Sequence, residues 1–64
     1  MYQDTDPQVR MEMAALTLHI QRGDATDIER QEKTLRQTME DRNRTDEDII
    51  YAIETCYQLA NGAN

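Results

Sequence analysis

Residues 6–23 read DPQVRMEMAALTLHIQRG, and this stretch decides the fold. Asp6 can cap a helix with its carboxylate, and Pro7 suits the first helical position, where its missing N–H costs nothing. Gly23 can take the left-handed conformation that ends many helices. These residues predict a helix over 7–22.

The predicted first helix is apolar on two opposite sides. At about 100° per residue, one apolar line contains Val9, Met13, Leu16 and Ile20. The opposite line contains Met11, Ala14, Ala15 and Leu18. Glu12 and His19 fall on a polar edge between the two lines. One line can pack against the rest of the chain, whereas the other needs a separate cover.

Two further helices follow from capping signals. Thr26 with Glu29 three residues later forms a potential capping box, and predicts a helix over 26–43. Thr45 with Asp48 predicts a third helix over 45–61, whose first turn is acidic and which ends before a glycine.

The remaining apolar residues keep helical spacing and indicate no strand. We therefore expect an all-α chain over residues 1–64: a single domain with three helices and short connections, in which residues 1–5 and 63–64 are frayed. This arrangement is either a small three-helix bundle or a helical hairpin with an additional N-terminal helix.

The second and third helices contribute unequal apolar faces. The second offers a narrow seam of Ile28, Leu35 and Met39, interrupted by Glu32. The third has a wide arc centred on Ile49, Ile53, Cys56 and Ala60, with Tyr51, Glu54, Thr55 and Gln58 facing away from it. A chain of this size builds a marginal core, and small domains usually add disulfides, metal or association.

Composition excludes the first two of these supports. The chain has 64 residues, a formal net charge of -6, one cysteine and one histidine. One cysteine closes no internal disulfide, and a single cysteine with a single histidine makes no zinc site. No apolar run is long enough to span a bilayer and no secretory leader is visible, so we expect a cytoplasmic chain without cofactor, metal or membrane contact.

Association is the support that remains, and we expect a homodimer or an obligate complex with a partner protein. The residues predicted to form this interface are Met11, Ala14, Ala15, Leu18, Ile50, Tyr51 and Tyr57.

Catalysis is not expected. Cys56 lies in the middle of an apolar arc without a basic neighbour on its helix, which is typical of a buried thiol. His19 sits near a helix C-terminus, where the helix dipole favours an imidazole. The chain also shows no glycine-rich phosphate loop, serine nucleophile elbow or cysteine pair.

The leading functional hypothesis is a small acidic regulator, adaptor or inhibitor of a partner protein, of the kind that bacteria, plasmids and phages encode. The alternative is an acidic mimic of nucleic acid that blocks the binding groove of an enzyme or defence complex. Its predicted patch comprises Asp24, Asp27, Glu40, Asp41, Asp46, Glu47 and Asp48. Direct nucleic-acid binding is disfavoured, because acids interleave with the basic residues Arg30, Lys33, Arg36, Arg42 and Arg44.

Overall fold

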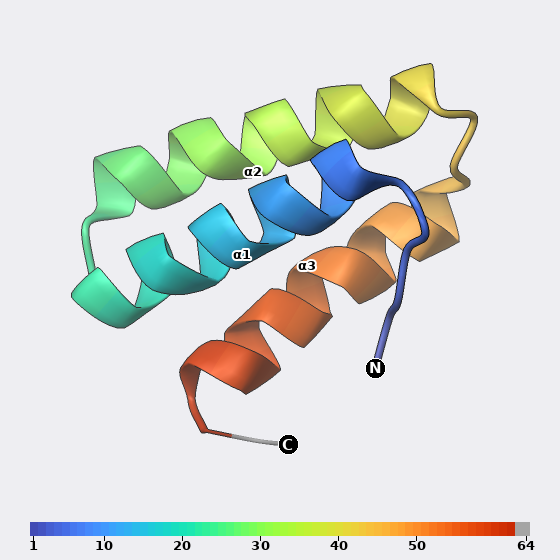
Figure 1. The fold of residues 1–64 in the computed structure, drawn as a ribbon. Helices are drawn as coiled ribbons and strands as arrows, with labels where there is room; N and C mark the ends of the chain where they lie inside the picture. Colours follow the sequence, from blue (N-terminus) through green and yellow to red (C-terminus); the bar gives the residue numbers. More distant parts are fainter. Residues whose placement is uncertain (63–64) are drawn as a thin grey trace.

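The computed structural model describes residues 1–62, and that part of the chain folds into three α-helices without a strand (Figure 1). The helices are α1 (Pro7–Arg22), α2 (Ala25–Asp41) and α3 (Asp46–Ala60). This confirms the predicted all-α three-helix architecture. None of these helices combines the length and the apolar character that a membrane span requires.

The ends of α1 are as the sequence predicts. The Asp6 carboxylate accepts hydrogen bonds from the backbone N–H groups of Gln8 and Val9, at 2.9 and 3.2 Å. At the other end Gly23 has a φ of 75°, and its N–H donates to the carbonyls of His19 and Ile20. A side chain at position 23 would be strained in this left-handed conformation.

The start of α2 differs from the prediction. Asp24, not Thr26, caps the helix, because its carboxylate accepts the N–H of Asp27 at 3.1 Å. Thr26 lies inside the first turn, so the expected capping box of Thr26 with Glu29 is wrong. The prediction failed because both residues are good caps, and the short connection after Gly23 places the earlier one at the helix end.

The second connection contains a left-handed residue. α2 ends at Asp41, two residues before the predicted end, and Asn43 takes a φ of 60° in the turn. Thr45 caps α3 as predicted, since its hydroxyl oxygen accepts the N–H of Asp48 at 3.1 Å.

Helix α1 lies between the other two, and packs against both α2 and α3, which make few contacts with each other (Figure 1). The fully buried core contains Val9, Leu16, Leu35, Met39, Ile49, Ala52 and Cys56. The predicted inner line of α1 and the seam of α2 therefore both contribute to this core.

Two residues assigned to polar edges are buried instead. Glu12 is only 8% exposed, and its Oε2 accepts hydrogen bonds from Gln8 Nε2 at 2.7 Å and Thr38 Oγ1 at 3.0 Å. Thr55 is 2% exposed, and its hydroxyl accepts the N–H of Tyr2 and donates to the carbonyl of Tyr51. These partners satisfy the hydroxyl of Thr55 and one oxygen of Glu12, whereas Glu12 Oε1 has no hydrogen-bond partner among the described residues.

The segment before α1 crosses α3 and makes specific contacts with it and with the connection between α2 and α3 (Figure 1). We call residues 2–5 the strap. Its Tyr2 N–H donates to Thr55 Oγ1 at 2.8 Å, and its Asp4 forms an ion pair with Arg44 at 2.7 Å. The sequence predicted that residues 1–5 are frayed and gave no sign of these contacts. The same prediction for residues 63–64 lies outside the described residues.

Candidate protein-interaction surface

The outer side of α1 carries a stripe of uncovered apolar residues. Met11 is 67% exposed and Leu18 is 51% exposed, whereas Val9 and Leu16 on the inner side are fully buried. Ala14 is exposed as well and Ala15 is half-buried; with Met11 and Leu18 they follow the spacing i, i+3, i+4 and i+7 that defines one helix face. We call this face the α1 stripe; it comprises Met11, Ala14, Ala15 and Leu18. As the sequence predicts, the chain itself leaves Met11 and Leu18 uncovered.

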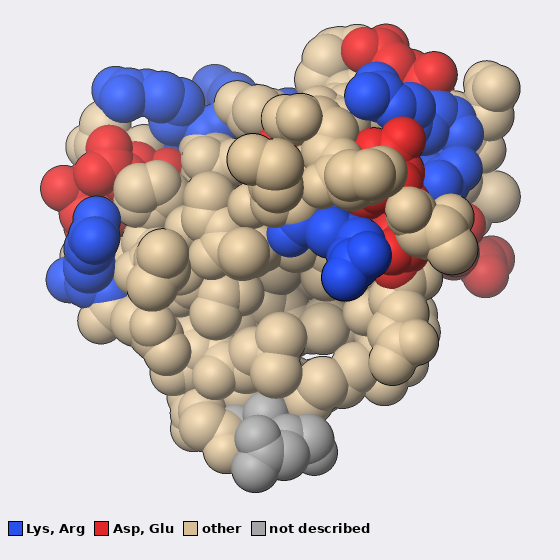
Figure 2. Space-filling view, viewed as in Figure 1, with Lys and Arg blue, Asp and Glu red and all other residues tan. Residues whose placement is uncertain are grey.

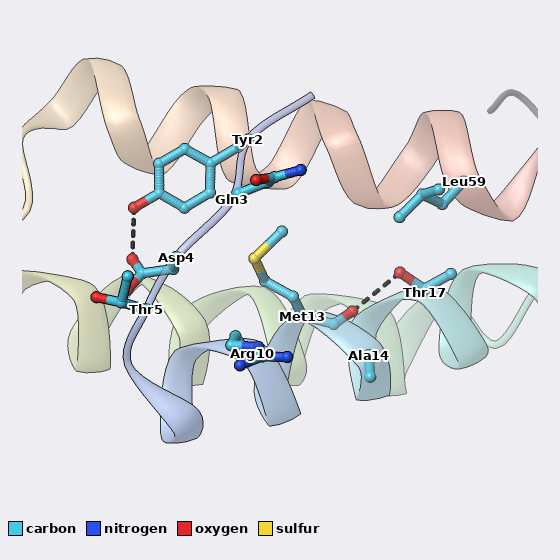
Figure 3. A pocket seen from close by; sticks show the side chains of 9 residues that line it. All are labelled: Tyr2, Gln3, Asp4, Thr5, Arg10, Met13, Ala14, Thr17 and Leu59. Atoms are coloured by element: carbon cyan, nitrogen blue, oxygen red, sulfur yellow. Dashed lines mark hydrogen bonds between the residues drawn. The ribbon is translucent and has the colours of Figure 1, made fainter.

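An open groove of about 960 Å³ lies next to the stripe, between the strap, α1 and α3 (Figure 3). We call it the strap groove. It is lined by Tyr2, Gln3, Asp4, Thr5, Arg10, Met13, Ala14, Thr17 and Leu59. Figure 3 shows Met13 reaching from α1 toward the strap, with Leu59 on the α3 side. Because Ala14 belongs to both, the groove and the stripe are continuous across α1.

The strap wall of this groove is fixed by polar and aromatic contacts. The Arg44 guanidinium donates to both oxygens of Asp4, at 2.9 and 2.7 Å, and holds the pKa of that carboxyl well below its usual range. The Tyr2 hydroxyl also donates to Asp4, and its ring meets Tyr51 edge-on with centroids 5.9 Å apart. Burial and the neighbouring Asp4 raise the pKa of Tyr2 to about 12. The wall is therefore part of the folded structure.

Charged side chains are unevenly distributed over the surface. Figure 2 shows them gathered toward the upper part of this face, while the lower part, over the C-terminal half of α3, carries none. Within the groove lining only Asp4 and Arg10 are charged, and Asp4 is already paired with Arg44. A hollowed area with so few charged side chains is suited to contact with another protein.

The other predicted interface residues do not join this surface as a single patch. Tyr51 packs against Tyr2 beside the strap. Tyr57 lines a different groove, between α2 and α3, and its hydroxyl donates to Glu32 at 3.2 Å. Ile50 is exposed on α3, one heptad from Tyr57 and therefore on the same helix face. The predicted set is thus divided among at least two surfaces.

The predicted acidic patch is divided too. Asp24 and Asp27 lie at the start of α2, and the other five acids lie at its far end and in the first turn of α3. A helix of this length separates the two groups by about 24 Å. At the α2–α3 end, Arg42 and Arg44 are paired with Asp6 and Asp4. The structure therefore does not bring the seven acids together.

The two side chains considered for chemistry are integrated into the packing. Cys56 is fully buried, its thiol lies 3.4 Å from the Met13 carbonyl, and burial raises the pKa of the thiol. His19 is half-buried near the end of α1, and its Nδ1 has no hydrogen-bond partner among the described residues. Residues 1–62 contain no group of three or more His, Cys, Asp or Glu side chains that could hold a metal ion.

The strap groove was not predicted from the sequence, since its walls come from three separate segments. Asp4 and Arg44 are 40 residues apart, and neither has a local signal of the pairing. No known protein family, curated protein or solved structure matches this chain. Function is therefore inferred from the surface of the chain itself.

Proposed function

We propose that this chain is a non-enzymatic protein-interaction module that forms a homodimer through the α1 stripe and regulates a partner protein by binding it. The observation that supports this proposal is the exposure of Met11 and Leu18 on one face of the central helix. The central helix of a small bundle normally buries its apolar residues, and exposed apolar faces mark interaction sites.

The stripe suits packing between two copies of α1. Met11 and Leu18 are seven residues apart, which is one heptad, and the two alanines between them let a second helix approach closely. A twofold contact uses each residue twice. Burial of an exposed Leu or Met side chain contributes about 1.5–3 kcal/mol. Met11 and Leu18 from the two copies would therefore supply much of the favourable free energy of association.

Dimerisation would also explain how so small a chain remains folded. The described core has seven fully buried hydrophobic residues, and neither a disulfide nor a metal cluster supplements it within residues 1–62. Association adds apolar burial that one copy lacks. A regulator, adaptor or inhibitor acts through such a binding surface, and this is the role that we propose.

The test introduces negatively charged side chains into the α1 stripe. The double variant Met11→Asp and Leu18→Asp should be monomeric by light scattering and keep most of its helical circular dichroism. The control, Thr26→Asp with Gln58→Asp, adds the same charge at exposed polar positions outside the stripe and should remain dimeric. A stripe variant with the mass of the unmodified dimer would overturn the proposal.

The acidic end of the molecule favours a second candidate, mimicry of nucleic acid. Glu40, Asp41, Asp46, Glu47 and Asp48 lie near the α2–α3 turn, and none forms an ion pair within the described residues. Binding of such a patch to a basic cleft should weaken steeply between low and high salt. Apolar docking through the stripe should change little, so a salt titration of the complex separates the two functions.

A further inference from the structure

Arg10 has no ion-pair partner among the described residues, and it lines a groove in which Asp4 is the one other charged side chain. The chain has seven basic residues, and four of them form ion pairs: Arg30, Lys33, Arg42 and Arg44. Arg10 forms none with the described residues, although the chain has thirteen acids. The one acid in the groove lining, Asp4, is held by Arg44. The groove therefore presents a positive charge without its own counter-ion.

We infer that the strap groove binds a short amphipathic helix of a partner protein, which places one carboxylate against Arg10 and its apolar side chains against Met13, Ala14 and Leu59. This inference rests on the proposed function, because it specifies the partner of the interaction module. It assigns self-association to the α1 stripe and partner binding to the strap groove.

The shape of the groove favours a helix over an extended segment. An extended segment must pair its backbone N–H and C=O groups, and the described walls offer no strand edge to pair with. A helix satisfies those groups internally. Ala14 and Thr17 are small, so a helix can lie close to α1 there. The span from Arg10 to Thr17 is about 10 Å, which corresponds to two turns of a bound helix.

The charge of the groove determines which residue the partner must carry. A guanidinium binds a carboxylate through two parallel hydrogen bonds, and this pairing gives direction as well as affinity. Arg10 precedes Met13 by one turn of α1, so the carboxylate of the partner should lie about one helical turn from the apolar side chain that contacts Met13. Asp or Glu should therefore recur three or four residues from an apolar position.

The experiment selects helical peptides from a randomised display library on the intact chain. We expect the selected peptides to share an acidic residue three or four positions from an apolar one. Replacing that acid with Gln should weaken binding to the intact chain by about tenfold. On the Arg10→Glu variant the same selection should enrich Lys or Arg at that position, whereas the matched control Arg36→Glu, on α2 outside the groove, should retain the acidic preference.

Several outcomes would overturn the inference. Peptides without a shared acid, peptides whose affinity is unchanged on Arg10→Glu, or peptides that still bind Leu59→Arg would show that the groove is not their site. Loss of self-association in Leu59→Arg would identify a second copy as the occupant instead. Each variant is first checked for unchanged helical circular dichroism. If the chain is monomeric but selects acidic helices, the dimer proposal fails and the groove inference stands.

Discussion

Glu12 is the most unusual buried residue, since its carboxylate forms no ion pair with the described residues. Its Oε2 accepts from Gln8 and Thr38, while Oε1 is buried without a partner among the described residues. Burial of a charge with only neutral donors opposes folding, whereas the two hydrogen bonds favour it. A neutral acceptor of the same shape should therefore be tolerated at this position.

Substitution of Glu12 separates these contributions. Glu12→Gln keeps an acceptor for Thr38 and removes the charge, so it should be at least as stable as the unmodified chain. Glu12→Ala also loses the acceptor and leaves Thr38 and Gln8 without their partner, which should cost about 1–3 kcal/mol. Urea unfolding measures both values. A Gln variant less stable than the Ala variant would contradict this account.

The strap makes stability depend on pH at both extremes. The pKa of Asp4 is lowered in the folded chain, mainly by Arg44, so its contribution is present above about pH 4 and is lost as the pH falls. The pKa of Tyr2 is raised to about 12, so its contribution is present below about pH 10 and is lost between about pH 10 and 12.

Melting curves recorded across pH test the strap. Tyr2→Phe should reduce the alkaline loss of stability, and Asp4→Asn should reduce the acid loss. Tyr57 lies outside the strap, but burial and Glu32 raise its pKa as well. The variant Tyr57→Phe therefore measures how much of the loss of stability at high pH comes from a tyrosine outside the strap. If the pH profile of the Tyr2 variant matches that of the unmodified chain, Tyr2 is not held in the strap as described.

At the scale of the element, local signals predict the three helices and their apolar faces, but they do not predict the burial of two polar side chains. Asp6, Gly23 and Thr45 act on backbone groups within four residues, so sequence reveals their roles. The burial of Glu12 and Thr55 depends on Thr38 and Tyr2, which are 26 and 53 residues away. The strap groove likewise requires segments that only the folded chain brings together.

The cap of α2 is a direct test at this scale. Asp24→Ala should destabilise the chain by about 1 kcal/mol, because the N–H of Asp27 loses its acceptor. Thr26→Ala should change the free energy of unfolding by less than half as much, since Thr26 lies within the first turn. Equal losses in chemical denaturation would instead support the capping box that the sequence suggested.

At the scale of the whole molecule, the position of α1 explains why one face stays uncovered. α2 and α3 flank α1 and hardly contact each other, so the two neighbours cover its inner side and leave the α1 stripe open. The helical spacing of Met11 and Leu18 made this face predictable. The division of the acidic residues between two ends follows from the length of α2, which the predicted helix over 26–43 already implied.

The central claim is that the α1 stripe is covered by a second copy in solution. Sedimentation equilibrium of the unmodified chain, over a range of loading concentrations, tests it most directly. We expect a mass near twice the 7.5 kDa of the chain, shifting toward one copy only on dilution. A helical, cooperatively folded species that keeps the mass of one copy at every concentration would contradict the account.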